Sequence, residues 1–253
     1  WNFPYLTAVN GVVPALMAGN AVVLKHSHQT PLCAERFAQA FEAAGLPKGL
    51  FQYLHLSHAN AEKLMGDVRV DFVNFTGSVP GGHAVQKAVG GKFIATGMEL
   101  GGKDPAYIRS DVNLDHAVEN VIDGAFFNTG QSCCGIERIY AHESVFDAFV
   151  EKAADLVGQY RLGSPIATDT NLGPMVRASS AAFVRGQIAD AVRDGAKALI
   201  DPTKFAANAE GTPYLAPQVL INVDHSMRVM SEESFGPVVG IMKVKSDAEA
   251  ISL

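Results

Sequence analysis

Residues 71–89, which read DFVNFTGSVPGGHAVQKAV, are the stretch that decides the fold class. Residues 71–76 predict a strand, Gly77 and Ser78 a tight turn, and the residues up to Val89 a helix. Strands that alternate with helices in this way form parallel sheets with crossover helices. Ligands then bind beyond the carboxyl ends of the strands, where the first turn of a helix offers free N–H groups to a phosphate. An ordinary turn without a ligand explains the pattern as well, and the G-x-G-x-x-G dinucleotide fingerprint is absent.

The same alternation extends on both sides of this stretch. Further strands are predicted at residues 21–25, 50–54, 93–100, 104–108, 139–141, 196–200, 218–223 and 238–244. Further helices are predicted at residues 31–44, 59–65, 114–128, 144–157 and 179–194. The chain is therefore predicted to be an α/β protein, and the Gly101-Gly102 pair is the expected joint between two domains, residues 1–101 and 102–253.

The composition excludes several classes of protein. Of the 253 residues, 48% are hydrophobic and 18% charged, close to the globular average, so disorder, coiled coils and collagen-like repeats are poor interpretations. A net charge of −6 without a basic run argues against a nucleic-acid partner or an anionic membrane. The most apolar stretch, residues 6–24, is interrupted by polar residues, Pro14 and Gly19, so it lacks the unbroken run of about 18 apolar residues that a membrane helix needs.

The cysteines and the two ends of the chain add two expectations. Three cysteines cannot form a disulfide framework, which favours a reducing, cytoplasmic compartment.

The chain begins at Trp1, with neither a Met nor a signal peptide, and residues 246–249 (SDAE) form a capping box that should open a helix of about three turns. Because the sequence stops at Leu253, in the second turn of that helix, we expect a fragment from the middle of a longer protein.

Cys133 and Cys134 stand in the loop NTGQSCCG (128–135), which follows a predicted helix. A cysteine among Gly, Ser and Thr is more accessible than one in an apolar strand, and it becomes a nucleophile when its pKa is depressed or a base is near. The alternative is an inert, half-buried thiol. The chain has no C-x-x-C or H-E-x-x-H pattern and its eight histidines are scattered, so we predict no metal site.

Three polar residues are candidates to assist such a nucleophile in catalysis. Glu99 lies in an otherwise apolar segment, GMELGGK, and burial there would raise its pKa into the range of a general base. Asn2 can donate an amide hydrogen bond to an oxyanion. Glu233 precedes a Gly-Pro turn in the segment EESFGP. Taken singly, each has an alternative without function. Glu99 can be an ordinary surface glutamate, Asn2 an asparagine without a role, and the segment with Glu233 a solvated turn.

Six motifs in a fixed order connect these candidates. They are WNFP (1–4), AGNAVVLK (18–25), FTGS (75–78), MELGGKDP (98–105), FFNTGQSC (126–133) and EESFGPV (232–238). In order and approximate spacing they resemble the aldehyde dehydrogenase superfamily, and the resemblance covers essentially the whole chain. Family chains are much longer. The N-terminal part of the cofactor domain, the C-terminal part of the catalytic domain and the oligomerisation segments would lie outside this stretch.

The resemblance implies a fold and a function. Residues 1–101 would be the C-terminal part of a Rossmann-like dinucleotide-binding domain, and residues 102–253 the N-terminal part of an α/β catalytic domain, in an aldehyde dehydrogenase-like fold. The implied reaction is the NAD- or NADP-dependent oxidation of a small-molecule aldehyde to a carboxylic acid through a cysteine thiohemiacetal and a thioester. The full-length enzyme would be a homo-oligomer, a dimer or a tetramer.

The resemblance also assigns roles to particular residues. Cys133 matches the family nucleophile, Glu99 the general base, and Asn2 the side-chain donor of the oxyanion hole, whose second donor is the backbone N–H of Cys133. The positions that match cofactor contacts are Trp1, Lys25, His28, Gly77 and Ser78, together with Glu233 and Phe235 at the nicotinamide ribose and ring. Thiolate attack, oxyanion stabilisation and activation of water each need a residue type that is present in this chain.

Two positions depart from the family pattern. Many NAD-using members have a Glu for the adenosine ribose where this chain has His28, which does not repel a 2′-phosphate and attracts it when protonated. We therefore expect NADP to be tolerated or preferred. Gly81 replaces an aliphatic residue that would pack on the adenine, which puts those contacts in doubt.

Two alternatives stay open: a CoA-acylating enzyme, against which Glu99 argues, and a catalytically silent structural remnant.

Overall fold

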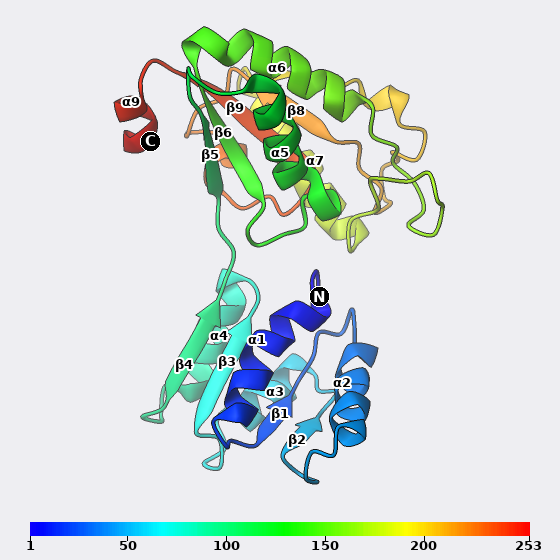
Figure 1. Cartoon of the computed structure of the whole chain (residues 1–253), viewed down its shortest axis with the longest axis vertical. Coiled ribbons are helices and arrows are strands. Elements are labelled where there is room, and N and C mark those ends of the chain that lie inside the picture. Colours follow the sequence, from blue (N-terminus) through cyan, green and yellow to red (C-terminus); the bar gives the residue numbers. More distant parts are fainter. The chain divides into compact units, whose positions relative to one another are not determined.

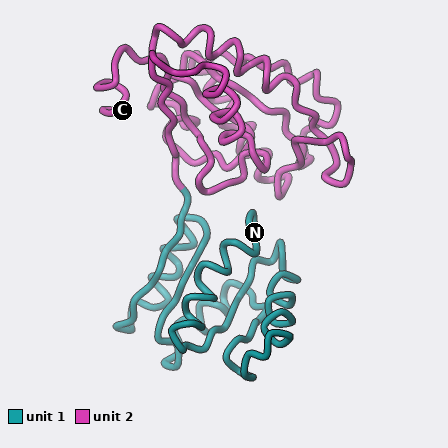
Figure 2. Tube along the Cα trace, in the orientation of Figure 1, with its two compact units in different colours: residues 1–101 teal, residues 102–253 magenta.

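The computed structural model describes all 253 residues, Trp1–Leu253. They form two compact units, unit 1 (Trp1–Gly101) and unit 2 (Gly102–Leu253), which Figure 2 shows in teal and magenta. Each unit has strands and a hydrophobic cluster of its own, and each is described by itself. Whether they are the cofactor-binding and catalytic parts stays a prediction.

Unit 1 consists of short parallel strands alternating with helices (Figure 1). Its elements are α1 (Pro4–Met17), β1 (Val22–Leu24), α2 (Leu32–Ala43), β2 (Phe51–Tyr53), α3 (His58–Met65), β3 (Phe72–Thr76), α4 (Val79–Val89) and β4 (Ala95–Glu99). β1 pairs in parallel with β2, and β3 in parallel with β4, so the unit holds two separate two-stranded sheets. These parallel strands agree with the α/β fold predicted from the sequence.

The strand, turn and helix predicted in the deciding stretch are β3, the turn after it and α4. Ser78 is the N-cap of α4, and its hydroxyl accepts a hydrogen bond from the Gly81 N–H at 3.3 Å. Val73 of β3 clusters with Val85 and Val89 of α4, and these three are the buried members of the unit's hydrophobic cluster. The first turn of α4 therefore follows directly from the carboxyl end of β3.

The sequence analysis did not predict helix α1. Its residues attracted notice only as an apolar stretch interrupted by a proline. Pro4 occupies the first helical position, where the missing N–H costs no helical hydrogen bond, and Pro14 lies near the end of the helix. Only Val12 of α1 is buried. An interior proline and a weakly segregated apolar face explain why the pattern gave no helix signal.

Unit 2 is built around one five-stranded sheet. Its elements are β5 (Asp104–Ile108), α5 (Leu114–Phe126), the 3₁₀ helix η1 (Phe127–Gly130), β6 (Ile136–His142), α6 (Glu143–Gly158), α7 (Ala178–Arg193), β7 (Lys197–Ala198), the 3₁₀ helix η2 (Pro202–Lys204), β8 (Gln218–Ile221), α8 (Arg228–Ser231), β9 (Val238–Val244) and α9 (Asp247–Ser252). The strand order is β5-β6-β9-β8-β7. All neighbours pair in parallel except β7, which is antiparallel to β8.

The expectation of parallel strands was wrong for β7. A parallel pair needs a crossover connection, usually a helix, that returns the chain to the same end of the sheet. Between β7 and β8 the chain contains only η2 and loop, and the second strand runs back along the first. β7 is also shorter than the predicted strand, with two residues.

Helices cover both faces of the sheet in unit 2 (Figure 1). Successive residues of a strand point to opposite faces, so Val219 of β8 joins one core cluster and Leu220 joins the other. The first cluster contains apolar residues of α5 and α6, and the second those of α7 and α8. Burial on both faces explains the almost continuously apolar sequence of β9, VVGIMKV.

Helix α9 begins at the predicted capping box. The Ser246 hydroxyl accepts a hydrogen bond from the Glu249 N–H at 3.2 Å, and the Glu249 carboxylate accepts one from the Lys245 N–H at 2.7 Å. A helix of three turns was predicted, and α9 has six residues in this chain. Among the helices of both units, none is both long and apolar enough to cross a bilayer.

Candidate functional site

Cys133 lies in a constrained loop of unit 2, shortly after η1. Asn128, Thr129 and Gly130 have φ angles of 51°, 61° and 69°, so three successive residues are left-handed. This conformation is unfavourable for residues other than glycine and persists only where surrounding contacts hold it. The Cys133 residue at the end of this segment is exposed, as the small polar residues around it predicted.

Gln131 supplies the contacts that hold this loop. Its side chain is buried, and its Oε1 accepts a hydrogen bond from the Val176 N–H at 2.7 Å. Its Nε2 donates to the carbonyl oxygens of Asn128 at 3.1 Å and Pro174 at 3.3 Å. The loop that carries Cys133 is therefore fastened to the segment that precedes α7.

The Cys133 loop also touches the loop that contains Glu233 and Phe235. A Cβ atom placed on Gly130 would lie 2.2 Å from the carbonyl oxygen of Gly236. Only glycine permits so close an approach, and its left-handed φ favours glycine as well. The motifs FFNTGQSC and EESFGPV, far apart in the sequence, thus meet backbone to backbone.

The surroundings raise the pKa of the Cys133 thiol. Partial desolvation is the main cause, the neighbouring Cys134 thiol adds to the increase through its charge and a hydrogen bond, and the Cys133 backbone N–H opposes it. A thiolate nucleophile needs a lowered pKa or a nearby base. Within unit 2 the pKa of Cys133 is raised, which is opposite to the lowering that a thiolate nucleophile needs. Cys134 is also exposed, and its Sγ lies 3.3 Å from the Ser132 hydroxyl oxygen.

A buried ion pair behind the loop of Glu233 and Phe235 was missed by the sequence analysis. Lys103 Nζ lies 2.7 Å from Glu137 Oε2 and donates to the Ser234 hydroxyl at 2.9 Å. The two charged side chains are only 9% and 6% exposed. Glu137 also accepts two backbone hydrogen bonds, from the Ser234 N–H at 2.7 Å and from the Phe235 N–H at 2.9 Å.

The charges around Glu233 shift its pKa in opposite directions. Burial raises the pKa of Glu233 and the charge of Glu137 adds to the increase, while a hydrogen bond from the Gly102 backbone and the charge of Lys103 lower it. Burial lowers the pKa of Lys103 and Glu137 opposes that shift. Glu233 Oε1 is buried and has no hydrogen-bond partner. This oxygen is an acceptor that a bound group with a hydroxyl can satisfy.

One signal in the sequence could have revealed the ion pair. Glu137 lies near the start of the strand 136–142, IERIYAH, between Ile136 and Arg138. A carboxylate inside a strand that is covered on both faces needs a buried cation or several N–H donors. Lys103 stands in the motif MELGGKDP, but no local spacing connects the two residues.

In unit 1, Glu99 and Gly77 lie at the carboxyl ends of neighbouring parallel strands. Thr76 of β3 is opposite Glu99 of β4, and the Gly77 N–H donates to the Glu99 carbonyl oxygen at 3.0 Å. The structure therefore joins the FTGS and MELGGKDP motifs. Of the two placements that the sequence left open for Glu99, buried or at the surface, unit 1 by itself shows the exposed one.

Gly77 and Gly81 both lie against the Phe75 ring in unit 1. A Cβ atom on Gly77 would lie 2.5 Å from Phe75 Cζ, and one on Gly81 would lie 2.6 Å from the same atom. A side chain at either position therefore requires the ring to move.

The remaining predicted residues of unit 1 lie before α1 and after β1. Asn2 precedes α1 with half-buried Trp1, and its Nδ2 is buried without a hydrogen-bond partner. Lys25 follows β1, and burial lowers its pKa. His28 is exposed; its Nε2 lies 2.8 Å from a backbone carbonyl oxygen, and its ring meets that of His58 edge-on at 5.3 Å.

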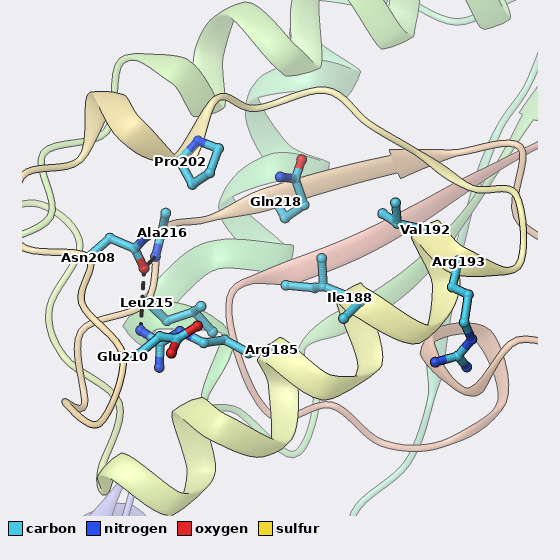
Figure 3. A pocket seen from close by; sticks show the side chains of 11 residues that line it. Arg185, Ile188, Val192, Arg193, Pro202, Asn208, Glu210, Leu215, Ala216 and Gln218 are labelled. Carbon is cyan, nitrogen blue, oxygen red and sulfur yellow. Dashed lines mark hydrogen bonds between the residues drawn. The ribbon is translucent and has the colours of Figure 1, made fainter.

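A cavity of about 600 Å³ elsewhere in unit 2 contains none of these residues (Figure 3). It lies between α7, which contributes Ile188, and the loop that contains Asn208 and Glu210. Arg185 at this cavity donates to Asn208 Oδ1 at 3.3 Å. In neither unit do three or more His, Cys, Asp or Glu side chains gather as metal ligands.

Comparison with known proteins gives a consistent result. The model of the aldehyde dehydrogenase family matches residues 1–253. Succinate-semialdehyde dehydrogenase (NADP(+)) 1 of Mycobacterium tuberculosis is 34% identical over 259 residues, covering 100% of this chain and 55% of the relative. Lactaldehyde dehydrogenase from Escherichia coli has a TM-score of 0.93 at 33% identity, covering 100% of this chain and 53% of that structure. An NADP-dependent enzyme of E. coli has a TM-score of 0.93 at 31% identity, covering 100% and 52%.

The fold and the candidate site together define an α/β chain with an exposed cysteine on a braced loop. The chain belongs to the aldehyde dehydrogenase family. It spans about half the length of the curated relatives that it matches. The resemblance and the fold class predicted from the six motifs are confirmed, and the roles of the individual residues stay predictions.

Proposed function

We propose that the protein containing this chain oxidises an aldehyde to a carboxylic acid with NAD or NADP, through a thiohemiacetal and a thioester on Cys133. The observation that carries the proposal is the match of the family model to all of residues 1–253, which include an exposed Cys133 on an anchored loop. Lactaldehyde and succinate semialdehyde, named in two of the relatives, are the first substrates to test.

In the proposed mechanism, the Cys133 thiolate attacks the aldehyde carbonyl carbon, a C–S bond forms, and the carbonyl oxygen becomes an oxyanion. The Asn2 amide and the Cys133 backbone N–H are the proposed donors to this oxyanion. The buried, unpaired Nδ2 of Asn2 supports its role, because a donor without a partner is available to bind an anion.

Glu99 is the proposed general base of the second half-reaction. When bound, the nicotinamide accepts the hydride that leaves the thiohemiacetal carbon, and the acyl group remains on Cys133 as a thioester. Glu99 takes a proton from water as the water oxygen attacks the thioester carbon. The C–S bond then breaks, the acid leaves, and the Cys133 thiolate is restored.

The residues of the chain fit a dinucleotide. Gly77 and Ser78 are assigned to the phosphates by their place in the FTGS motif, directly before the first turn of α4. The buried, unpaired Oε1 of Glu233 suits a ribose hydroxyl. Trp1, Lys25 and Phe235 are assigned to the cofactor by their places in the motifs.

We propose that NADP is used at least as well as NAD. His28 is an exposed imidazole beside a second histidine, and it places no fixed negative charge where a 2′-phosphate would bind. Two of the relatives are described as NADP enzymes. His28→Glu should reverse the preference by repelling the 2′-phosphate, and kcat/KM for the two cofactors measures the change.

We also propose that the full-length protein is a cytoplasmic homo-oligomer.

The test uses the natural gene product with an aldehyde panel, following formation of the reduced nicotinamide and of the acid. Cys133→Ser should abolish turnover, with a loss of about 10³-fold or more, while cofactor binding stays measurable. Cys33→Ser is the matched control and should keep full activity. Turnover by Cys133→Ser would refute the nucleophile, and a product that forms only with added CoA would establish the CoA-acylating alternative instead.

Glu99→Gln separates the two half-reactions. The thioester should still form, because the base acts on water after hydride transfer. We expect one rapid burst of reduced cofactor, followed by a steady-state rate lower by about 10²–10⁴-fold. Stopped-flow absorbance measures both phases. A variant with the wild-type steady-state rate would remove Glu99 from the mechanism.

A further inference from the structure

Both oxygens of the Glu137 carboxylate are committed to one loop and one cation. Oε1 accepts the Phe235 N–H at 2.9 Å, and Oε2 accepts the Ser234 N–H at 2.7 Å and lies 2.7 Å from Lys103 Nζ. Lys103 in turn donates to the Ser234 hydroxyl at 2.9 Å. Two consecutive backbone N–H groups and one ammonium group thus converge on a single buried carboxylate.

This arrangement explains an unusual backbone angle. Phe235 has a φ of +50°, in the left-handed region that bulky residues rarely adopt. The N–H groups of Phe235 and of the residue before it both donate to the Glu137 carboxylate. Glu137 therefore holds Phe235 in a conformation that the residue would otherwise leave.

The ion pair also connects two separate motifs, MELGGKDP and EESFGPV. Lys103 belongs to the first of them, and the Arg138 side chain donates to the Lys103 carbonyl oxygen at 2.8 Å. Glu137 follows the Cys133 loop at the start of β6. The loop clamped by this pair carries the two side chains, Glu233 and Phe235, that flank Ser234.

We propose that Glu137, with Lys103 as its buried counter-ion, is a positioning residue that fixes the loop of Glu233 and Phe235 for the nicotinamide end of the cofactor. The inference rests on the proposed function for the part that concerns the cofactor. The clamp on the loop itself rests only on contacts within unit 2. Glu137 acts through the backbone of Ser234 and Phe235 and touches no reacting atom.

The first test needs no catalytic activity. Glu137→Gln keeps the size of the side chain, but one carboxylate oxygen becomes an NH₂ group that faces N–H donors and the Lys103 ammonium. Hydrogen exchange measured by mass spectrometry should become about tenfold faster or more in the peptide around residues 233–236, because the amide hydrogen bonds open. The strands β6 and β9 should keep their protection, which shows that the variant is folded. Unchanged exchange at residues 233–236 overturns the proposal.

Glu232→Gln is the matched control. Glu232 is an exposed acid one residue before Glu233, and its side chain pairs with Arg228 at 2.9 Å. The substitution removes the same charge beside the same loop without touching the clamp. We expect wild-type exchange and kinetics from it. Lys103→Arg, which keeps the cation, should retain most of the loop's protection, whereas Lys103→Met should lose it. If Lys103→Met exchanges like the wild type, Lys103 is not part of the clamp.

The second test addresses the cofactor. In the natural gene product, Glu137→Gln should raise KM for NADP about tenfold or more and leave KM for the aldehyde and the alkylation rate of Cys133 unchanged. A faster-exchanging loop with unchanged NADP kinetics would reduce Glu137 to a structural role and overturn the positioning claim. A wild-type protein that neither binds NADP nor oxidises aldehydes would overturn the proposed function and this cofactor role with it. In that case the exchange result still decides whether the clamp exists.

Discussion

Units 1 and 2 bury their apolar side chains to very different degrees. Unit 2 has one continuous five-stranded sheet with a hydrophobic cluster on each face. Unit 1 has two separate two-stranded sheets and a cluster with three buried residues, and it carries eleven of the seventeen large exposed apolar side chains of the chain, Met17 among them. A two-stranded sheet is marginally stable by itself. In this chain, unit 2 therefore has a large packed core and unit 1 a small one.

The two units also hold their candidate residues differently. In unit 2, Cys133 and Phe235 stand in loops with left-handed backbone that buried polar side chains brace. In unit 1, Glu99 and His28 are exposed residues that follow or end short strands. Proteins keep strained backbone where surrounding structure over-determines it. All four non-glycine residues with a positive φ lie in unit 2, the unit with the larger core, and the predictions below test this contrast.

The largest expected effect is the loss of a core side chain in unit 2. Ile139 of β6 is completely buried, so Ile139→Ala should lower the free energy of unfolding of unit 2 by about 4 kcal/mol, through lost transfer energy and a cavity. The matched change in unit 1 is Ile94→Ala, at a half-buried residue packed on the small cluster, and should cost about 1 kcal/mol. Native-state hydrogen exchange in each unit measures both. Equal losses in the two units would break the comparison.

The next effect comes from adding a methyl group to a left-handed glycine in each unit. Gly130 (φ +69°) would place its Cβ 2.2 Å from the Gly236 oxygen, whereas Gly45 (φ +78°) has nothing within 4 Å. Gly130→Ala should cost about 3 kcal/mol, because the strained backbone and the clash add. Gly45→Ala has only the backbone strain, about 1 kcal/mol. Urea unfolding measures both, and similar costs would show that the two loops of unit 2 are free to move apart.

The fold class could be predicted from the sequence because each element carries its own signal. The strand, glycine turn and helix of residues 71–89 are specified by residues that are neighbours in the chain, and Ser78 caps α4 through Gly81, three residues away. The six motifs likewise need only their order. Helix α1 gave no such signal, because Pro14 interrupts its pattern.

Features that depend on distant residues could not be predicted. The antiparallel direction of β7 follows from how the chain returns between β7 and β8, which no local spacing encodes. The pairing of Lys103 with Glu137 and the hydrogen bond from Ser234 to Glu137 join residues 34 and 97 positions apart. The sequence likewise left open whether Glu99 is buried or exposed, since burial depends on what packs over a strand end; within unit 1 the residue is exposed.

The smallest expected effect concerns the two adjacent thiols of unit 2, with Cys33 of unit 1 as the internal reference. The charge and hydrogen bond of Cys134 contribute to the raised pKa of Cys133. Cys134→Ala removes both contributions, so the pKa of Cys133 should fall and its thiolate fraction at any pH below that pKa should rise. Alkylation of Cys133 by iodoacetamide should then become severalfold faster at neutral pH, with the rate profile displaced to lower pH. The desolvation that is the main cause of the raised pKa stays, so the displacement should be partial. Peptide mass spectrometry follows Cys133 and Cys33 in the same sample, and the Cys33 profile should not move. A Cys133 profile that keeps its midpoint would show that the neighbouring thiol does not control the nucleophile.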